Sequence, residues 1–292
     1  MRDILLISGL PRLLKENFKS IVTLCSGLHN PAVYCHFWCN DDASANTISY
    51  FIKLMEQAEI EVHVVTESPL SPEDLIKLCQ TKKDHKQIAF PTNGVSQFLS
   101  VKKAFNFAKN NCSDDIRLVF RTRSDLLCTN RILPLRNVKD KTVYLSYRSQ
   151  YCGVADTFAF GNFESMELYC DFIEFIRENI NLLCGSPEIV LAQYLYQTGA
   201  RVEFGRFNYP YIILRQSNNN LKILHSPIAI ERRHNIRLTM PGLPENFTIT
   251  TIVGPFLKRI SMRLYLPVIA GLYMYPKLIK HKVKFRVFGF QI

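Results

Sequence analysis

Short apolar runs alternate along the first two-thirds of the chain with longer segments in which apolar residues recur every three or four positions. The runs Ile4–Ser8, Val33–Trp38 and Ile60–Val65 predict buried β-strands. Between them, Leu14–Leu28 and Thr47–Ala58 carry their apolar residues on one face, which predicts amphipathic helices. This order is typical of a mainly parallel sheet flanked by helices, so the predicted fold class is α/β and Rossmann-like.

The alternation continues through the middle of the chain. Pro69–Asn93 is polar and irregular, which predicts a surface loop with a short helix. The further predicted strands are Ile116–Phe120, Val143–Tyr147, Thr157–Phe160, Arg201–Phe204 and Tyr211–Leu214, and the further helices are Gly94–Lys109, Glu164–Leu183 and one from Ser186-Pro187 to Gly199. Residues 1–215 are therefore predicted as one domain, residues 216–250 as a loop or lid region over its site, and residues 251–292 as a separate extension.

Most of the net charge of +11 lies in that extension, because no Asp or Glu follows Glu245 whereas eight Lys and Arg do. They surround the apolar stretch Leu264–Pro276, which is too short to span a bilayer. Basic residues around apolar ones favour an amphipathic element on an anionic membrane surface. A C-terminal helix packed on the core and a nucleic-acid-binding tail are the alternatives.

Nine cysteines are scattered through the chain without a Cys-x-x-Cys pair, and most lie within apolar runs. This pattern is typical of reduced thiols that pack as small apolar residues. Together with the basic extension it predicts a cytoplasmic protein attached peripherally to the inner face of the cell membrane.

The segment from Leu118 to Leu127 carries the strongest chemical signal, because an apolar strand leads into Arg121, Arg123 and Asp125. Side chains two positions apart in a strand lie on the same face, so these three groups are expected to meet. Guanidinium groups neutralise phosphate oxygens, and a carboxylate binds a divalent ion or a sugar hydroxyl, which together predict a pyrophosphate site. An ion-pair cluster that satisfies its own charges is the alternative.

The same segment resembles the Arg-x-Arg-x-Asp signature of bacterial lipopolysaccharide and capsular-polysaccharide glycosyltransferases, the WavE-like group. Segments Ser8–Arg12, Gln97–Ala104 and Ala155–Gly161 agree with it, and the resemblance covers roughly residues 4–200. It implies a GT-A fold, a nucleotide-sugar donor and a lipid-linked glycan or polysaccharide acceptor, as in the biosynthesis of lipopolysaccharide, O-antigen or capsule.

The resemblance also implies roles for individual residues. GT-A enzymes usually hold Mg²⁺ or Mn²⁺ on the donor diphosphate with an Asp-x-Asp pair, whereas this chain has only Asp125 as the predicted metal ligand. Metal dependence is therefore left open, since Arg121 and Arg123 could stabilise the leaving diphosphate instead. His225 is predicted to bind the diphosphate, with a buried structural histidine as the alternative.

Two loops after the first strands carry further donor-binding candidates. Gly9 would let the backbone approach the nucleotide and Arg12 would reach a phosphate, although a plain turn with a solvated arginine fits equally well. The segment lacks the Gly-x-Gly-x-x-Gly of dinucleotide binders, which argues against a dehydrogenase. Asp41 is predicted either to bind the base or ribose or to cap the helix that follows.

Glycosyl transfer requires a carboxylate near the anomeric carbon, either as a base or to stabilise positive charge. Asp156, at a strand edge, is the first candidate, and Glu188, in the first turn of a helix, is its rival. The sequence thus predicts a glycosyltransferase whose partners are a nucleotide sugar, a lipid-linked glycan and an anionic membrane, without nucleic acid. A nucleic-acid-binding α/β module with a basic tail and a non-catalytic nucleotide-sugar-binding homologue are the alternatives.

Overall fold

The structure, a computed structural model, describes residues 1–79, 90–128, 138–145, 154, 156–180, 183, 187–204, 211–217, 220–225, 286–287 and 290–291. Residues 127, 128, 189 and 204 and the last four of these segments are described by their backbone alone. The helices are α1 (Leu14–Cys25), α2 (Asp42–Gln57), α3 (Pro72–Leu78), α4 (Thr92–Asn111), α5 (Phe163–Cys170), α6 (Phe172–Asn179) and α7 (Pro187–Gln197). The strands are β1 (Arg2–Gly9), β2 (Ala32–Trp38), β3 (Glu61–Glu67), β4 (Ile116–Arg123), β5 (Leu126–Cys128), β6 (Thr142–Leu145), β7 (Ala159–Gly161), β8 (Arg201–Phe204), β9 (Tyr211–Ser217), β10 (Asn220–His225), β11 (Arg286–Val287) and β12 (Phe290–Gln291).

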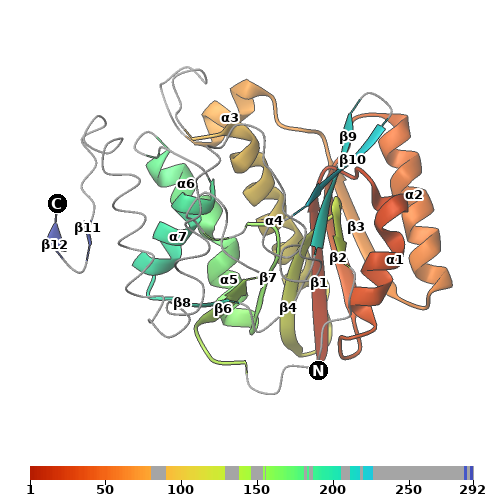
Figure 1. The fold of residues 1–292 in the computed structure, drawn as a ribbon, viewed down its shortest axis with the longest axis horizontal. Helices are drawn as coiled ribbons and strands as arrows, with labels where there is room; N and C mark the ends of the chain where they lie inside the picture. Colours follow the sequence, from red (N-terminus) through yellow and green to blue (C-terminus); the bar gives the residue numbers. More distant parts are fainter. Residues whose placement is uncertain are drawn as a thin grey trace, which may run out of the picture.

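A seven-stranded sheet with the order β3-β2-β1-β4-β7-β6-β8 forms the centre of the fold. Strands β3, β2, β1 and β4 run parallel, and β6 and β8 also pair in parallel. Helices α1 and α2 cover one face of the sheet, while α4 to α7 cover the other (Figure 1). The predicted α/β fold with a mostly parallel sheet is therefore confirmed.

Alternate residues of β1 separate the two layers of the core. Ile4 and Leu6 pack on the side of α4, and Leu5 and Ile7 pack on the side of α1 and α2. A strand that is buried on both faces reads as a continuous apolar run, which is why the sequence pattern located it correctly.

Two departures from the predicted elements lie in the central sheet and the helices that cover it. Strand β7 pairs antiparallel with both β4 and β6, so the sheet is mixed. The single helix predicted over Glu164–Leu183 is two helices, α5 and α6, interrupted at Asp171. The Asp171 carboxylate pairs with Lys102 of α4, so the interruption lies where this layer contacts α4. Helical spacing alone did not reveal the interruption, because apolar residues continue on the same face through both helices.

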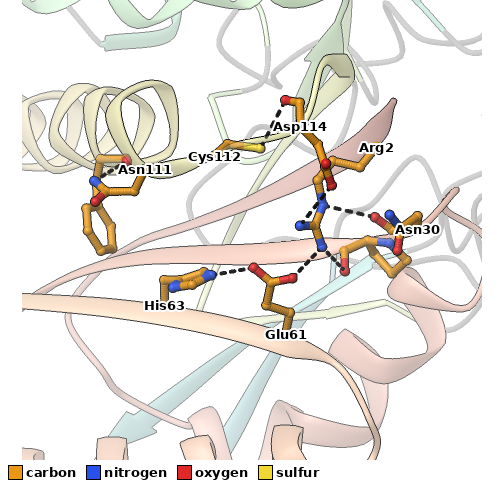
Figure 2. Close-up of polar contacts among 9 residues, drawn as sticks. Arg2, Asn30, Glu61, His63, Asn111, Cys112 and Asp114 are labelled. Atoms are coloured by element: carbon orange, nitrogen blue, oxygen red, sulfur yellow. Dashed lines mark hydrogen bonds and ion pairs between the residues drawn. The ribbon is translucent and has the colours of Figure 1, made fainter.

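Ion pairs close the amino end of β1 (Figure 2). Arg2 Nη2 lies 2.7 Å from Glu61 Oε2, and Arg2 also pairs with Asp114. Glu61 in turn accepts a hydrogen bond from His63, which contributes most to the lowered pKa of this carboxyl group. These charged groups pair with one another at the amino-terminal edge of the sheet. The candidate residues lie at the opposite edge, at the carboxyl ends of β1 and β4.

A second sheet of three strands has the order β10-β9-β5. Because β5 follows Asp125 directly, the hairpin β9–β10 is joined to the segment that carries the predicted site. The predicted boundary at residue 215 falls inside β9. Of the predicted basic extension, 251–292, the structure describes only β11 and β12, which pair antiparallel; the rest lies outside the described residues.

Candidate functional site

The carboxyl ends of β1 and β4 lie side by side in the centre of the sheet. From β1 the chain proceeds to β2 and β3 on one side, and β4 then occupies the other side of β1. In open α/β sheets, the point where the strand order reverses in this way is where ligands bind. The two loops that leave these strands carry Gly9 and Arg12 on one side, and Arg123 and Asp125 on the other.

The loop after β1 contacts the turn after β4. Ser124 Oγ donates a hydrogen bond of 2.5 Å to the carbonyl oxygen of Leu10. Gly9 has φ +114°, a conformation that favours glycine, and a Cβ built on it would meet no atom within 4 Å. The backbone at Gly9 therefore borders open space, as its predicted approach to a ligand requires.

Arg123 and Asp125 form a bidentate ion pair. Arg123 Nε lies 2.8 Å from Asp125 Oδ1, and Nη2 lies 2.7 Å from Oδ2. Their side chains are 17% and 12% exposed, so the pair is at the edge of solvent rather than in the core. Asn17 of α1 holds the turn by donating to the carbonyl oxygens of Ser124 and Leu126. Two of the three charged groups predicted to meet on β4 are thus brought together.

Arg121 lies apart from this pair. Its side chain is 0% exposed, and one Nη donates to the backbone oxygen of Asp156. Its Nε and other Nη have no hydrogen-bond partner among the described residues. A contact between Arg121 and a diphosphate, as the sequence predicts, would require neighbouring residues to move.

Asp156 lies just before β7 and is 9% exposed. Its carboxylate Oδ2 accepts a hydrogen bond of 2.7 Å from Gln97 Nε2 of α4. The structure also brings Glu188 toward this segment, because Val154 N donates to the Glu188 carbonyl oxygen over 3.1 Å. Both predicted carboxylate residues therefore belong to the same region, on the α4 side of the sheet.

A second polar network ties α4 to β1 and β2. The Ser100 hydroxyl accepts from Gly9 N over 2.8 Å and donates to the carbonyl oxygen of His36 over 3.1 Å. His36 Nδ1 lies 2.8 Å from the same oxygen, and His36 Nε2 lies 3.5 Å from Glu67 Oε1. Burial lowers the pKa of His36, and nearby Lys103 lowers it further, whereas Glu67 raises it. Lys103 donates to both Glu67 carboxylate oxygens over 2.6 Å.

The other predicted donor-binding residues are Arg12, Asp41 and His225. Arg12 is exposed in the loop after β1. Asp41 caps α2, and its side chain accepts from Ser44 N over 2.6 Å, as one of its two predicted roles requires. His225 is the last residue of β10, and its backbone pairs with Ile212 of β9. Ile212 also pairs with Leu127 of β5, the strand that follows Asp125. His225 therefore lies two strands away from β5.

The described residues do not fit a divalent metal ion. Both carboxylate oxygens of the predicted ligand Asp125 accept from Arg123. Over the described ranges, no three His, Cys, Asp or Glu side chains gather in a way that could hold a metal.

Sequence reasoning assigned no role to Asn17 and did not foresee the contacts of Gln97 and Ser100. Asn17 is 0% exposed although it is polar, and it falls between Leu14 and Ile21 on the apolar face of α1. A polar residue within an apolar helical face was the available signal, because buried polar groups are retained where they have partners.

Among the described residues, no helix has the length and apolar character needed to cross a membrane.

Comparisons with known proteins gave structural matches only. No protein-family model matches the chain, and no curated protein matches it. A galactosyltransferase, LgtC, solved with donor and acceptor sugar analogues, is 10% identical with a TM-score of 0.45, and the match covers 70% of this chain and 74% of that one.

Two further matches were found among glycosyltransferase structures. GlyE of Streptococcus pneumoniae TIGR4 is 11% identical with a TM-score of 0.38, over 69% of this chain and 44% of that one. Mouse xyloside xylosyltransferase 1 is 11% identical with a TM-score of 0.38, over 70% of this chain and 85% of that one. This chain therefore spans less than half of GlyE, and at these identities and TM-scores none of the matches identifies its function.

Proposed function

We propose that the chain is a glycosyltransferase of the GT-A type that transfers a sugar from a nucleotide-sugar donor to a lipid-linked glycan or polysaccharide. The observation that carries the proposal is the meeting of three segments at the carboxyl edge of the sheet. The loop at Gly9 contacts the turn of Arg123 and Asp125 through Ser124, and the Asp156 segment is attached to β4 through Arg121. These segments carry a backbone that borders open space, a cation at the edge of solvent and a carboxylate.

The donor diphosphate is assigned to the edge formed by Gly9, Arg12 and Arg123. The Arg123 guanidinium offers a planar fork that suits phosphate oxygens, and it is 17% exposed. As the bond between the sugar and the diphosphate breaks, negative charge develops on the leaving group, and a fixed cation stabilises it. In the structure, Asp125 accepts from the Nε and Nη2 atoms of this guanidinium and so fixes its orientation.

The first test replaces Arg123 with lysine, which retains the charge but loses the fork. A thermal-shift screen of nucleotide sugars first identifies the donor, and release of nucleoside diphosphate then measures turnover. We expect Arg123→Lys to raise the donor KM about tenfold or more, since a hydrogen bond to a charged group contributes about 1.5–3 kcal/mol.

Arg177→Lys is the matched control, because Arg177 also pairs with a carboxylate, Glu174, but lies on α6 away from this edge. A screen in which no nucleotide sugar raises the melting temperature or is turned over would refute the proposed function. An unchanged donor KM in Arg123→Lys would refute the assigned diphosphate contact.

The second test separates the two carboxylates. We assign Asp156 to the acceptor hydroxyl or the sugar and retain Glu188 as the rival. Asp156→Asn is expected to lower kcat at least a hundredfold with little change in donor affinity, since positioned acid–base groups contribute about 10²–10⁴-fold. A larger loss of kcat in Glu188→Gln than in Asp156→Asn would transfer the assignment to Glu188.

The assignment to surface-polysaccharide biosynthesis, and to the WavE-like group in particular, rests on the sequence resemblance. The proposed peripheral attachment to the inner face of the cell membrane rests on the charge and apolar pattern of residues 251–292. An enzyme held at an anionic membrane surface would meet lipid-linked acceptors there at a raised local concentration.

A further inference from the structure

Two side chains from different elements hold Asp156 at two separate atoms. Gln97, on α4, donates to the carboxylate Oδ2 over 2.7 Å. Arg121, on β4, donates to the backbone oxygen of the same residue. The first contact fixes the rotation of the carboxylate, and the second fixes the position of the backbone that carries it. The structure gives the other carboxylate oxygen, Oδ1, no hydrogen-bond partner among the described residues.

The surroundings of Asp156 are closed on the protein side. Arg121 is 0% exposed, and the hydroxyl of Tyr169 on α5 is buried without a partner among the described residues. Burial raises the pKa of Tyr169, Arg121 lowers it and Asp156 raises it, so these groups lie within electrostatic range of one another. The Asp156 carboxylate therefore contacts an amide from α4, and its backbone contacts a guanidinium from β4.

We propose that Gln97 is a positioning residue, which orients the Asp156 carboxylate so that Oδ1 faces the reacting groups, while Arg121 supports the same residue from within the protein. The inference rests on the proposed glycosyl transfer and on the assignment of Asp156. Under this inference, Arg121 holds the backbone of Asp156 and does not contact the diphosphate.

The step that this arrangement serves needs no reagent besides the donor and the acceptor. The acceptor hydroxyl oxygen forms a bond to the anomeric carbon, and its proton moves to Asp156 Oδ1. The bond between the anomeric carbon and the diphosphate oxygen breaks, and the nucleoside diphosphate leaves with the electron pair. A carboxylate that is free to rotate would present Oδ1 less often, because proton transfer requires hydrogen-bond distance and alignment.

The test compares Gln97→Met and Gln97→Glu with the parent chain. Gln97→Met keeps the length of the side chain and removes the amide, so we expect kcat to fall about 10- to 100-fold while the donor KM stays within about twofold. Gln97→Glu places a second carboxylate beside Asp156, so the acid limb of the rate profile should move to higher pH by about one unit, because neighbouring carboxylates retain a shared proton.

The matched controls are Gln57→Met and Gln57→Glu, which make the same changes at an exposed position on α2. Both controls should retain the parent kcat and pH profile. Melting temperatures of all the variants identify any that fail to fold, and the pH profile of Gln97→Glu then decides, because loss of packing alone does not move it.

The outcomes separate the inference from the proposed function. A parent chain that turns over no nucleotide sugar refutes both. An active parent with unchanged kcat and pH profile in the Gln97 variants refutes the positioning role alone. A parallel change of kcat and donor KM in Gln97→Met, without a pH shift in Gln97→Glu, also refutes it, because that pattern indicates general structural damage.

Discussion

Arg121 and Arg123 lie two positions apart on one strand, yet their surroundings differ. Arg121 is fully buried and binds the backbone of Asp156, whereas Arg123 lies near solvent and pairs with Asp125. The alternation of a strand predicts that both point to the same side of the sheet. How deeply each is buried depends on the layer packed above it, which the spacing of the residues does not contain.

Protonation of His36 is expected to make stability depend on pH. Because burial holds the pKa of His36 below its ordinary value of 6.5, the unfolded chain binds a proton that the folded chain does not. The free energy of unfolding should therefore fall as the pH falls from about 7 to 5. Urea unfolding at several pH values measures this slope, and His36→Gln should flatten it.

His63→Gln is the control for this prediction, because His63 is a partly exposed histidine whose ring lies at the opposite end of the sheet. It should retain the fall in stability toward low pH. An equal slope in the parent chain and in His36→Gln would show that another group is responsible.

Helix α4 connects the separate parts of the candidate site. Gln97 contacts Asp156, Ser100 contacts Gly9 and His36, and Lys103 contacts Glu67 at the end of β3. These three residues are three positions apart, so they occupy one side of the helix. The same helix buries Phe98, Val101 and Phe105 in the core, which fixes its polar residues against the sheet.

Loss of the Ser100 hydroxyl should loosen the loop after β1. Ser100→Ala leaves the Gly9 N–H without its partner, which is expected to lower the free energy of unfolding by about 1–3 kcal/mol. The donor KM should rise as well, because Gly9 borders the proposed donor edge. Chemical denaturation and donor titration measure the two effects.

Ser26→Ala provides the comparison for Ser100→Ala, since the Ser26 hydroxyl also bonds to a backbone oxygen but is exposed. Its effect on stability should stay within about 0.5 kcal/mol. Equal effects of the two substitutions would argue against a connection between Ser100 and the loop at Gly9.

At the scale of the whole molecule, charge is distributed unevenly between the α/β domain and the C-terminal residues. Replacing four lysines of the extension by glutamine should weaken binding of the full chain to vesicles that contain anionic lipid, because each basic residue near such a surface contributes about 1 kcal/mol. The substituted residues are Lys277, Lys280, Lys282 and Lys284. Vesicle sedimentation at low and high salt measures the effect.

The control variant replaces four exposed lysines of the domain by glutamine and so changes the net charge by the same amount. The residues are Lys15, Lys19, Lys53 and Lys77. This variant should bind vesicles nearly as well as the parent chain. Equal binding by the parent and by the variant of the extension would contradict membrane attachment through residues 251–292.

The sequence by itself determined most strands and helices of the domain, because burial repeats every two residues in a strand and about every 3.6 in a helix. It also placed Gly9, Arg123 and Asp125 at strand ends, since the end of an apolar run is a local feature. Tertiary structure alone decided the antiparallel insertion of β7 and the contact between Gln97 and Asp156, which are 59 positions apart. Pairings of this kind depend on how separate layers pack against one another, and the periodicity of a single segment carries no information about its neighbours in space.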